Sequence, residues 1–497
     1  MELRELIRAK PVEKSLADTH ESGHALTRTL SALDLTVFGV GVIIGTGIFV
    51  LTGTAAKSHA GPAVALSFAA AGVVCALAAL CYAEFASTVP VAGSAYTFAY
   101  STIGELPAWI IGWDLVLELT LGAAVVSVGW SGYVQSLLKS GGVTLPHAIS
   151  GASTGGWSFN LLASLLVLLL TAVILLGMHL SAEVTRVIVA IKVTVVLIVI
   201  VAGLFFVKAD NYSPFIPPAQ ETPGKAGGSQ PLIQALFGYT PTDFGVMGIF
   251  TAAAVVFFAF IGFDIVATTA EETRNPQRDL PRGILGSLVI CTVLYMAVSL
   301  VVTGMQKYTE LSTDAPLADA FKAVGQDAFA DIIDVGAVAG LTSVTMIMLL
   351  GQSRVFFAMS RDGLLPRLFS SVHPKYKTPT RAILLLGLVV AVLAGLIPLE
   401  ELSELVNIGT LFAFIVVSIG VVILRRTRPD LPRSFRCPWV PVLPILSVLA
   451  CLWLMLNLPV QTWWRFLVWL VVGLVVYFLY GRGHSRLGRD ADGGVEP

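Results

Sequence analysis

Long apolar runs, separated by short polar stretches, dominate the pattern of the chain. A transmembrane helix needs about 20 predominantly apolar residues, and we find twelve such runs. They lie near residues 33–54, 62–86, 107–137, 160–178, 184–207, 248–270, 283–305, 332–359, 380–397, 402–424, 440–457 and 464–480. The pattern predicts an all-α polytopic membrane protein with 12 transmembrane helices. The third and eighth runs are longer than a perpendicular crossing requires, so we expect both helices to be tilted.

Composition agrees with this class of protein. Of the 497 residues, 56% are hydrophobic and 13% are charged, whereas about 25% are charged in an ordinary soluble domain. The net charge of −1 gives no reason to expect a nucleic acid partner. The five cysteines form no CxxC pair, so neither a disulfide nor a metal site is expected.

The distribution of cations predicts the orientation in the membrane. Twelve crossings place both termini on one side, and most of the 31 Lys and Arg residues fall in the loops of that side. By the positive-inside rule both termini are predicted to be cytoplasmic, in the plasma (inner) membrane. Residues 1–32 are polar and lack a cleavable signal pattern.

The first crossing contains an unusual density of glycine. Four of the eleven residues from Gly39 to Phe49 are glycines, which are weak helix formers. A break at bilayer depth is tolerated where the freed backbone is buried in protein or lines a polar cavity. If the helix opens at 45–47, the half beginning near Gly47 offers N–H groups to a carboxylate. The half ending near Ile43 then offers carbonyls to an ammonium. The alternative reading is close helix packing through small residues.

The sixth crossing repeats this irregularity, because Gly262 and Asp264 lie in the middle of its apolar run. Crossings one and six are five apart, and an odd repeat length inverts the second copy in the membrane. Interrupted helices at matching positions of two inverted halves point to the binding site of a transporter. The resulting divisions are a cytoplasmic segment 1–32, a first repeat 33–207, an extracellular loop 208–247, a second repeat 248–424, two further crossings 425–481 and a cytoplasmic tail 482–497.

Four ionisable residues lie deep in the predicted crossings: Glu84, Glu118, Lys192 and Asp264. A charge exposed to lipid costs a few kcal/mol or more, so each is expected to face the interior with a partner. Lys192 is interpreted either as a group that gains and loses a proton or as a permanent cation that donates to carbonyls of the broken helices.

The other ionisable residues receive different interpretations. Glu118 can line the cavity and meet a cationic side chain or a proton, whereas Asp114, one turn earlier, is expected at the membrane boundary. For Asp264, capping of the following half-helix is slightly favoured. Glu84 is interpreted as a cytoplasmic gate or packing contact. Arg361 is a cation that can pair with the acidic residues of the loop 271–282 and fasten a cytoplasmic gate. Met346 and Met348 are expected in the core, although methionine can also fill a specificity pocket.

The chain resembles the amino acid, polyamine and organocation (APC) superfamily of transporters, and most closely its bacterial cationic amino acid transporter branch. The resemblance covers roughly residues 28–480. It rests on Gly41-Val-Ile-Ile-Gly45-Thr46-Gly47-Ile48-Phe49, Pro90-Val-Ala-Gly93-Ser94-Ala-Tyr96, Phe260-Ile-Gly262-Phe-Asp264, Glu271-Glu272-Thr-Arg-Asn275-Pro276 and Ala358-Met-Ser-Arg361-Asp362-Gly363-Leu-Leu-Pro366.

This resemblance implies a five-plus-five inverted repeat like that of the sodium-coupled leucine transporter type, followed by two C-terminal helices. The family's backbone ligands for substrate fall on Ile43, Thr46, Gly47, Phe258 and Ile261. Lys192 matches a lysine that lies where sodium-driven relatives bind an ion, which implies proton coupling and no sodium site. Glu118 and Asp264 match acidic positions near the side-chain pocket.

The predicted function is secondary active transport of L-amino acids, cationic or small and neutral, by proton-coupled symport with alternating access. The alternative is an exchanger of an amino acid for its amine product. No P-loop, HExxH or Ser-His constellation suggests an enzyme, and no cofactor is expected. The expected partners are the substrate and the lipid bilayer, and a small single-span membrane partner is left open.

Overall fold

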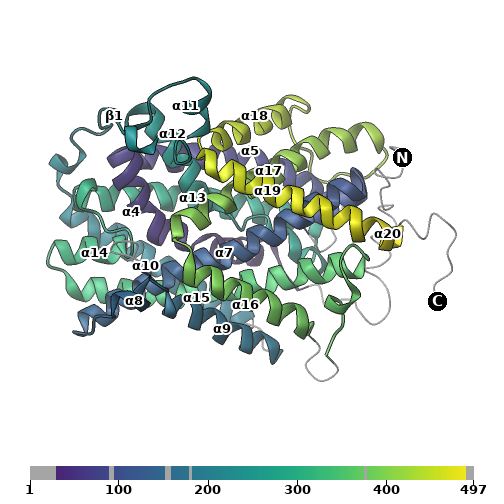
Figure 1. Cartoon of the computed structure of the whole chain (residues 1–497). Coiled ribbons are helices and arrows are strands. Elements are labelled where there is room, and N and C mark those ends of the chain that lie inside the picture. The colour runs from purple at the N-terminus through teal and green to yellow at the C-terminus, as the bar shows by residue number, and fades with distance from the viewer. Residues whose placement is uncertain (1–28, 89–93, 152–157, 178–181, 374–377, 488–497) are drawn as a thin grey trace.

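A computed structural model of the chain describes residues 29–88, 94–151, 158–177, 182–373 and 378–487. Helices dominate this described part (Figure 1). Eight helical segments in it are long and apolar enough to cross a membrane, and four further apolar helices are shorter. The prediction of an all-α polytopic membrane protein is therefore confirmed. The shorter four are α3, α9, α16 and α18, and α3 is short because a break ends it.

The elements of the first half of the chain begin and end as follows. They are α3 (Ala32–Ile43), η1 (Gly47–Leu51), α4 (Thr52–Ala55), η2 (Ala56–Ala60), η3 (Gly61–Ala63), α5 (Val64–Thr88), α6 (Ser94–Thr102), α7 (Glu105–Ser140), α8 (His147–Ser150), α9 (Leu161–Leu175), α10 (Ala182–Gly203), η4 (Leu204–Phe206), η5 (Ala209–Tyr212), β1 (Gln220–Glu221), η6 (Pro223–Lys225), α11 (Leu232–Leu236) and β2 (Thr242–Asp243). Here η1 and η2 are π-helical turns and the other η segments are 3₁₀ turns.

The second half contains a similar series of helices. Its elements are α12 (Gly245–Val256), η7 (Phe257–Phe260), η8 (Ile265–Glu272), α13 (Pro276–Met305), η9 (Tyr308–Glu310), α14 (Pro316–Ala323), α15 (Asp327–Arg361), η10 (Arg367–Phe369), α16 (Thr380–Leu396), α17 (Leu399–Thr427), α18 (Val442–Leu456), α19 (Val460–Val476), η11 (Tyr477–Gly481) and α20 (Arg482–His484).

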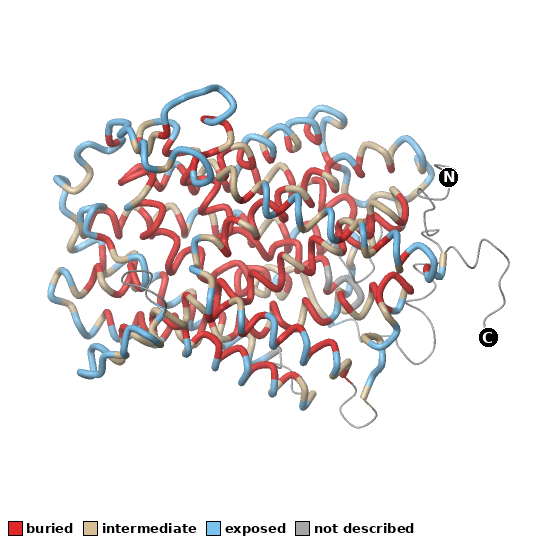
Figure 2. Tube along the Cα trace, in the orientation of Figure 1, coloured by how far each residue is buried: buried red, intermediate tan, exposed pale blue. Residues whose placement is uncertain are grey.

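The two longest helices form the middle of the bundle. α7 has 36 residues and α15 has 35, and they pack against each other. α13 packs against both α3 and α5, so the first crossing is held between later helices. Buried residues follow this interior along the whole bundle, and exposed residues gather at its two ends and on outer helix faces (Figure 2).

The long loop after α10 folds into its own small unit. β1 and β2 pair antiparallel, with Gln220 opposite Asp243. The loop is attached to the turn between α18 and α19, because Leu232 N–H donates to the Leu458 carbonyl at 2.9 Å. β1 and α14 lie at one end of the bundle and α20 at the other (Figure 1). The loop therefore covers the end of the bundle opposite to α20.

Candidate functional site

The first crossing is broken where its glycines predicted a break. α3 ends at Ile43, and Ile44 has an extended backbone with ψ 98°. The chain bends at Ile44 and Gly45, returns to helical backbone at Thr46 and continues as the π-helical turn η1 from Gly47. The carbonyls at the end of α3 and the N–H groups at the start of η1 thus lose the continuous helical hydrogen-bond ladder.

The sixth crossing is broken as well. α12 gives way to η7, and Ile261 then has an extended backbone with ψ 135°. Gly262 has φ 118°, a conformation that residues with a side chain rarely adopt. An added Cβ at Gly262 would also lie only 2.7 Å from the Cγ1 atom of Val42. Glycine is therefore required here both by the backbone turn and by the close approach of the first crossing.

The two breaks lie against each other in the interior. An ideal Cβ on Gly47 would lie 2.1 Å from the Cα atom of Ala259, so η1 contacts η7 backbone to backbone. The five predicted substrate-binding residues all belong to this region and are all buried: Ile43, Thr46, Gly47, Phe258 and Ile261. The arrangement is closed to solvent and offers main-chain polar atoms from two helices at one place.

Side chains from other helices bind the carbonyls that the breaks release. The Tyr295 hydroxyl of α13 donates to the carbonyls of Ile43 (2.7 Å) and Ala259 (2.9 Å), and one proton is shared between the two. Asn407 of α17 donates to the carbonyls of Ala254 and Val255 at 2.7 and 3.1 Å. Sequence reasoning missed both residues. In the sequence, each of them is marked only by a polar side chain inside an apolar run.

Lys192 lies on α10 and is 1% exposed. Its ammonium group donates to the Gly41 carbonyl at 2.6 Å, just before the first break. Its side chain also packs against Gly340 of α15, where an ideal Cβ would lie 3.0 Å from the lysine Cγ. Lys192 therefore joins α3, the first half of the first crossing, to α10 and α15.

Substitution of Tyr295 by phenylalanine tests the link between the breaks. The ring remains and the hydroxyl is lost, so the two buried carbonyls lose the donor that they share. Leaving a buried carbonyl without its donor costs about 1 to 3 kcal/mol of folding free energy. We expect a lower melting temperature and a fall in substrate affinity of roughly tenfold, measured by thermal unfolding and ligand titration. The matched control is Tyr239→Phe in the exposed loop, which should change neither. Unchanged affinity in Tyr295→Phe would contradict a role for this hydroxyl in arranging the site.

The four glycines of the first crossing have different surroundings. Ideal Cβ atoms on Gly39 and Gly41 would collide with Ser287 and Val189, at 2.5 and 2.3 Å. These two glycines serve close helix packing, which is the alternative reading of the motif. Gly45 instead has ordinary space, since its ideal Cβ would lie 3.6 Å from Val344. Close packing therefore accounts for Gly39 and Gly41, and Gly45 stays a predicted position of the binding site.

A comparison of Gly45→Ala with Gly47→Ala separates binding from packing. Gly45→Ala adds a methyl group beside the predicted ligand atoms where there is room, so we expect a folded protein with weakened substrate binding. Gly47→Ala drives a methyl group into the Ala259 backbone, so we expect a loss of stability as well. Thermal unfolding and ligand titration on both variants check this difference. Full substrate affinity in Gly45→Ala would count against the predicted site.

Three carboxyl groups gather beside the second break. Glu118 on α7 lies within electrostatic range of Asp264 and Asp114, and within hydrogen-bonding reach of Thr410. Glu118 and Asp264 are 2% and 3% exposed. The two predicted pocket acids are thus brought together. The three carboxyl groups give this part of the interior an acidic character, which suits a cationic group of a substrate.

Asp114, which was expected at the membrane boundary, lies inside the helix bundle. Asp114 is completely buried, and neither of its carboxyl oxygens has a hydrogen-bond partner within the described part of the chain. Gly409 of α17 makes room for it, because an ideal Cβ there would lie 2.5 Å from an Asp114 oxygen. Its neighbours Trp109 and Trp113 pack on Tyr477 of η11 and Trp469 of α19, respectively. α17 and α19 therefore cover this face of α7.

Met346 and Met348 are both buried on α15. The Met348 sulfur lies over Gly122 of α7, where an ideal Cβ would be 2.8 Å away. Met348 therefore fills the contact between the two longest helices, which agrees with its interpretation as a core residue.

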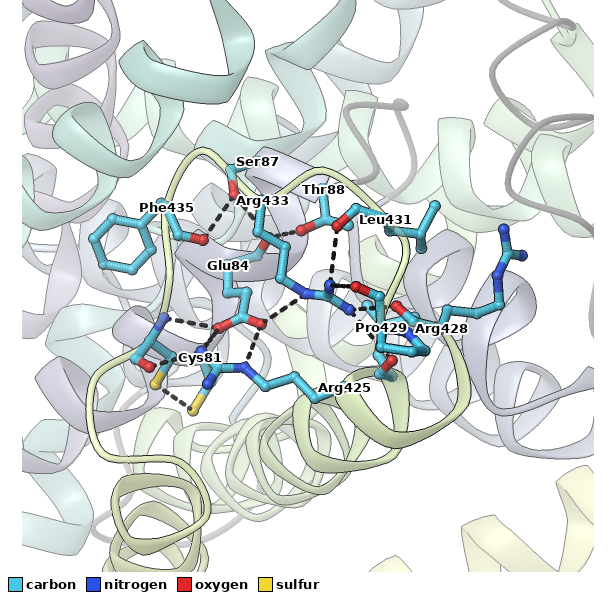
Figure 3. Close-up of polar contacts among 12 residues, drawn as sticks. Cys81, Glu84, Ser87, Thr88, Arg425, Arg428, Pro429, Leu431, Arg433 and Phe435 are labelled. Carbon is cyan, nitrogen blue, oxygen red and sulfur yellow. Dashed lines mark hydrogen bonds and ion pairs between the residues drawn. The ribbon is translucent and has the colours of Figure 1, made fainter.

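The two predicted gate residues do not meet in this conformation. Glu84 is fully buried and accepts hydrogen bonds from the Arg425 side chain at 2.6 and 2.9 Å and from Cys437 N–H at 2.7 Å (Figure 3). Arg433 lies 3.4 Å from the same carboxylate. Arg361 is exposed, and no ion pair is found for it among the described residues.

Sequence reasoning also missed an ion pair between Asp34 and Arg186. Its two charged groups are 2.9 Å apart, and it joins the start of α3 to α10.

Comparisons with known proteins give the family. A family model described as amino acid permease matches residues 30–477. The methylthioribose transporter of Bacillus subtilis (strain 168) is 48% identical, over 97% of this chain and 99% of that protein. The branched-chain amino acid permease BcaP of the same organism is 49% identical, again over 97% and 99%. The vacuolar cationic amino acid transporter 4 of Arabidopsis thaliana is 33% identical, over 98% and 97%.

These matches span nearly the whole chain, and each relative is named as a permease or a transporter. None of the three names denotes an enzyme. The chain therefore belongs to the amino acid permease family, within the APC superfamily, and is a multi-pass membrane transporter.

Proposed function

We propose that this transporter carries L-amino acids and binds the amino acid backbone between the two broken helices. The observation that carries the proposal is the contact of two interrupted crossings whose freed main-chain groups meet in a closed interior. The carboxylate of the substrate is assigned to the N–H groups at Thr46 and Gly47, and the ammonium to carbonyls of Ile43, Phe258 and Ile261. Helix N-termini favour anions and helix C-termini favour cations.

The proposed architecture has twelve crossings in a five-plus-five inverted repeat with two added helices. The order of elements supports it: α3 with η1, α5, α7, α9 and α10 precede the long loop, and α12 with η8, α13, α15, α16 and α17 follow it. The broken helix comes first in each set of five. α18 and α19 remain as the additional pair, and the positive-inside rule places both termini in the cytoplasm.

The proposed coupling ion is the proton. Lys192 supports this assignment, because its buried ammonium group holds the carbonyl of Gly41 and can release it on losing a proton. The cluster of Glu118, Asp264 and Asp114 offers further proton acceptors near the second break. No sodium site is part of this proposal.

The substrate class is proposed as cationic or small neutral amino acids. Glu118 and Asp264 supply negative charge for a cationic side chain, and in their protonated form they accommodate a neutral one. The relatives' names cover both kinds, since one is a branched-chain and another a cationic amino acid transporter.

Uptake into proteoliposomes tests the proposal. Purified protein is reconstituted, and labelled amino acid is offered with an inward proton gradient, with a sodium gradient or with neither. Symport predicts accumulation that requires the proton gradient and is collapsed by a protonophore. Uptake that follows sodium and ignores pH would overturn the coupling. Uptake only against a preloaded internal amine would favour the exchanger.

A further inference from the structure

The outer half of the first crossing ends at a histidine that lies between two carboxylates. His59 of η2 is 8% exposed. Its Nδ1 atom is 3.5 Å from an Asp243 oxygen, and its Nε2 atom is 3.9 Å from a Glu400 oxygen. Asp243 belongs to β2 in the long loop, and Glu400 begins α17. Three segments that are distant in sequence thus meet around one imidazole ring.

The backbone of His59 is fixed in addition to its ring. Its carbonyl accepts a hydrogen bond from Phe244 N–H at 3.0 Å. Phe244 has φ 63°, which is rare for a bulky residue. An ideal Cβ on Gly248 of α12 would lie 2.2 Å from the His59 carbonyl oxygen. The outer ends of the first and sixth crossings are therefore joined at His59.

Two carboxylates are the charged groups nearest to the ring. Burial raises the pKa of Asp243, but its contacts with His59 and Lys225 outweigh burial and keep the pKa below the ordinary value. Asp243 therefore stays ionised in mildly acidic solution. Glu400 is half exposed, and Glu401 beside it is paired with Arg465. The other titratable groups on the elements around His59 are Lys57, Tyr308, Glu310 and the buried Glu404, and α12 carries no charged residue. Glu404 lies one turn after Glu400 on α17 and accepts a hydrogen bond from the Thr462 hydroxyl at 2.7 Å.

A neutral imidazole has one N–H and no charge, whereas the protonated ring has two N–H groups and a positive charge that attracts both carboxylates at 3.5 and 3.9 Å. Histidine is the side chain whose charge changes between about pH 5 and 8. Protonation thus adds a second ionic contact across the place where the outer half of the first crossing meets the loop and α17. Because both contacts are lost when these segments separate, protonation stabilises the closed form, and this stabilisation disappears as the pH rises.

We propose that His59, Asp243 and Glu400 form a proton-binding site at the outer end of the transporter, separate from the central site, which holds the outer half of the first crossing closed when it is occupied. As a regulator of transport it rests on the proposed function, because alternating access requires these segments to separate. A transporter driven by protons would then have its opening rate limited at low external pH. The result is an optimum in the pH profile rather than a steady rise toward acid.

Hydrogen–deuterium exchange of residues 47–60 in the ligand-free full-length protein tests the site. Wild type and His59→Gln are compared at the same pH, so that the intrinsic pH dependence of exchange cancels. At pH 5.5 we expect exchange in His59→Gln to be roughly fivefold faster than in wild type, the factor for one lost partly buried ion pair. At pH 8 the two proteins should exchange alike. An equal ratio at both pH values would overturn the proposal.

Two further variants provide controls. Lys57, two residues before His59, donates to the Leu311 carbonyl at 3.0 Å. Lys57→Met removes another contact of the same segment, one that does not involve the imidazole, so it should accelerate exchange equally at both pH values. Glu400→Gln is placed at a half-exposed position that tolerates change. It should accelerate exchange at pH 5.5 and not at pH 8, and it replaces His59→Gln in the test if His59→Gln unfolds. An effect of Glu400→Gln that is independent of pH would overturn the proposal.

Proteoliposome uptake then connects the site with transport. His59→Gln should raise uptake at pH 5.5 relative to wild type and leave uptake at pH 8 unchanged. The exchange experiment contains no substrate, so its result remains valid even if no variant transports amino acids. A lack of uptake in wild type and in every variant would count against the proposed function alone. Normal uptake with the same pH profile in wild type and His59→Gln would overturn the regulatory role.

Discussion

Lys192→Met is expected to reduce proton-driven amino acid uptake by roughly tenfold to a hundredfold. The substitution preserves much of the side-chain volume but removes the charge-assisted hydrogen bond to the buried Gly41 carbonyl. Leaving such a carbonyl unsatisfied costs about 1 to 3 kcal/mol, and that cost falls on one arrangement of the first crossing. Initial rates of uptake across a pH series measure the loss.

The two interpretations of Lys192 differ in the residual activity. If the lysine carries the coupling proton, the remaining uptake of Lys192→Met should no longer respond to the proton gradient. If it is a permanent cation, the remaining uptake should be slower but still coupled. Lys208→Met, in the loop after α10, is the matched control and should behave as wild type. Full, normally coupled uptake in Lys192→Met would contradict both interpretations.

Glu84→Ala is expected to cause the largest loss of stability. This carboxylate joins the end of α5 to Arg425 of α17 and to the Arg433 and Cys437 region that leads into α18 (Figure 3). Its side chain is 0% exposed and that of Arg433 is 6% exposed. Removing one partner of a buried ion pair costs about 3 to 5 kcal/mol because the remaining charge has no counter-charge. The melting temperature and the fraction of protein that stays monodisperse in detergent report the effect.

A double-variant cycle identifies the source of that loss. Arg425→Met alone should also destabilise the protein, and the combination with Glu84→Ala should cost less than the sum of the two. Asp430→Ala, at the exposed pair of Asp430 with Arg428, should change the melting temperature little because exposed ion pairs contribute 0 to 1 kcal/mol. Additive effects of Glu84→Ala and Arg425→Met would contradict the ion pair as the source of stability.

The apolar runs and the glycines predicted the parts of the fold that local chemistry determines. Helical crossings follow from runs of about 20 apolar residues, and the breaks follow from glycine at positions that cannot continue a helix. Gly262 with φ 118° is the clearest case, because the broken geometry there requires glycine.

The contacts of the site could not be predicted in the same way. Tyr295 and Asn407 reach the broken helices from α13 and α17, so their role depends on how distant helices pack. Asp114 shows the same limit. Its place near the start of an apolar run suggested the membrane boundary, but α17 and α19 cover that face of α7. The partner of Glu84 was missed for this reason as well, since 341 residues separate it from Arg425.

The central claim is that main-chain atoms of two broken helices hold both ends of an amino acid. The most direct test is ligand-induced thermal stabilisation across the twenty L-amino acids, the N-acetyl and methyl ester derivatives of the best one, and methylthioribose. Only ligands with both a free ammonium and a free carboxylate should stabilise, and loss of either end should weaken binding at least a hundredfold. Methylthioribose has neither group. Stabilisation by methylthioribose, or by the esters and N-acetyl derivatives as strongly as by the free amino acid, would contradict the account.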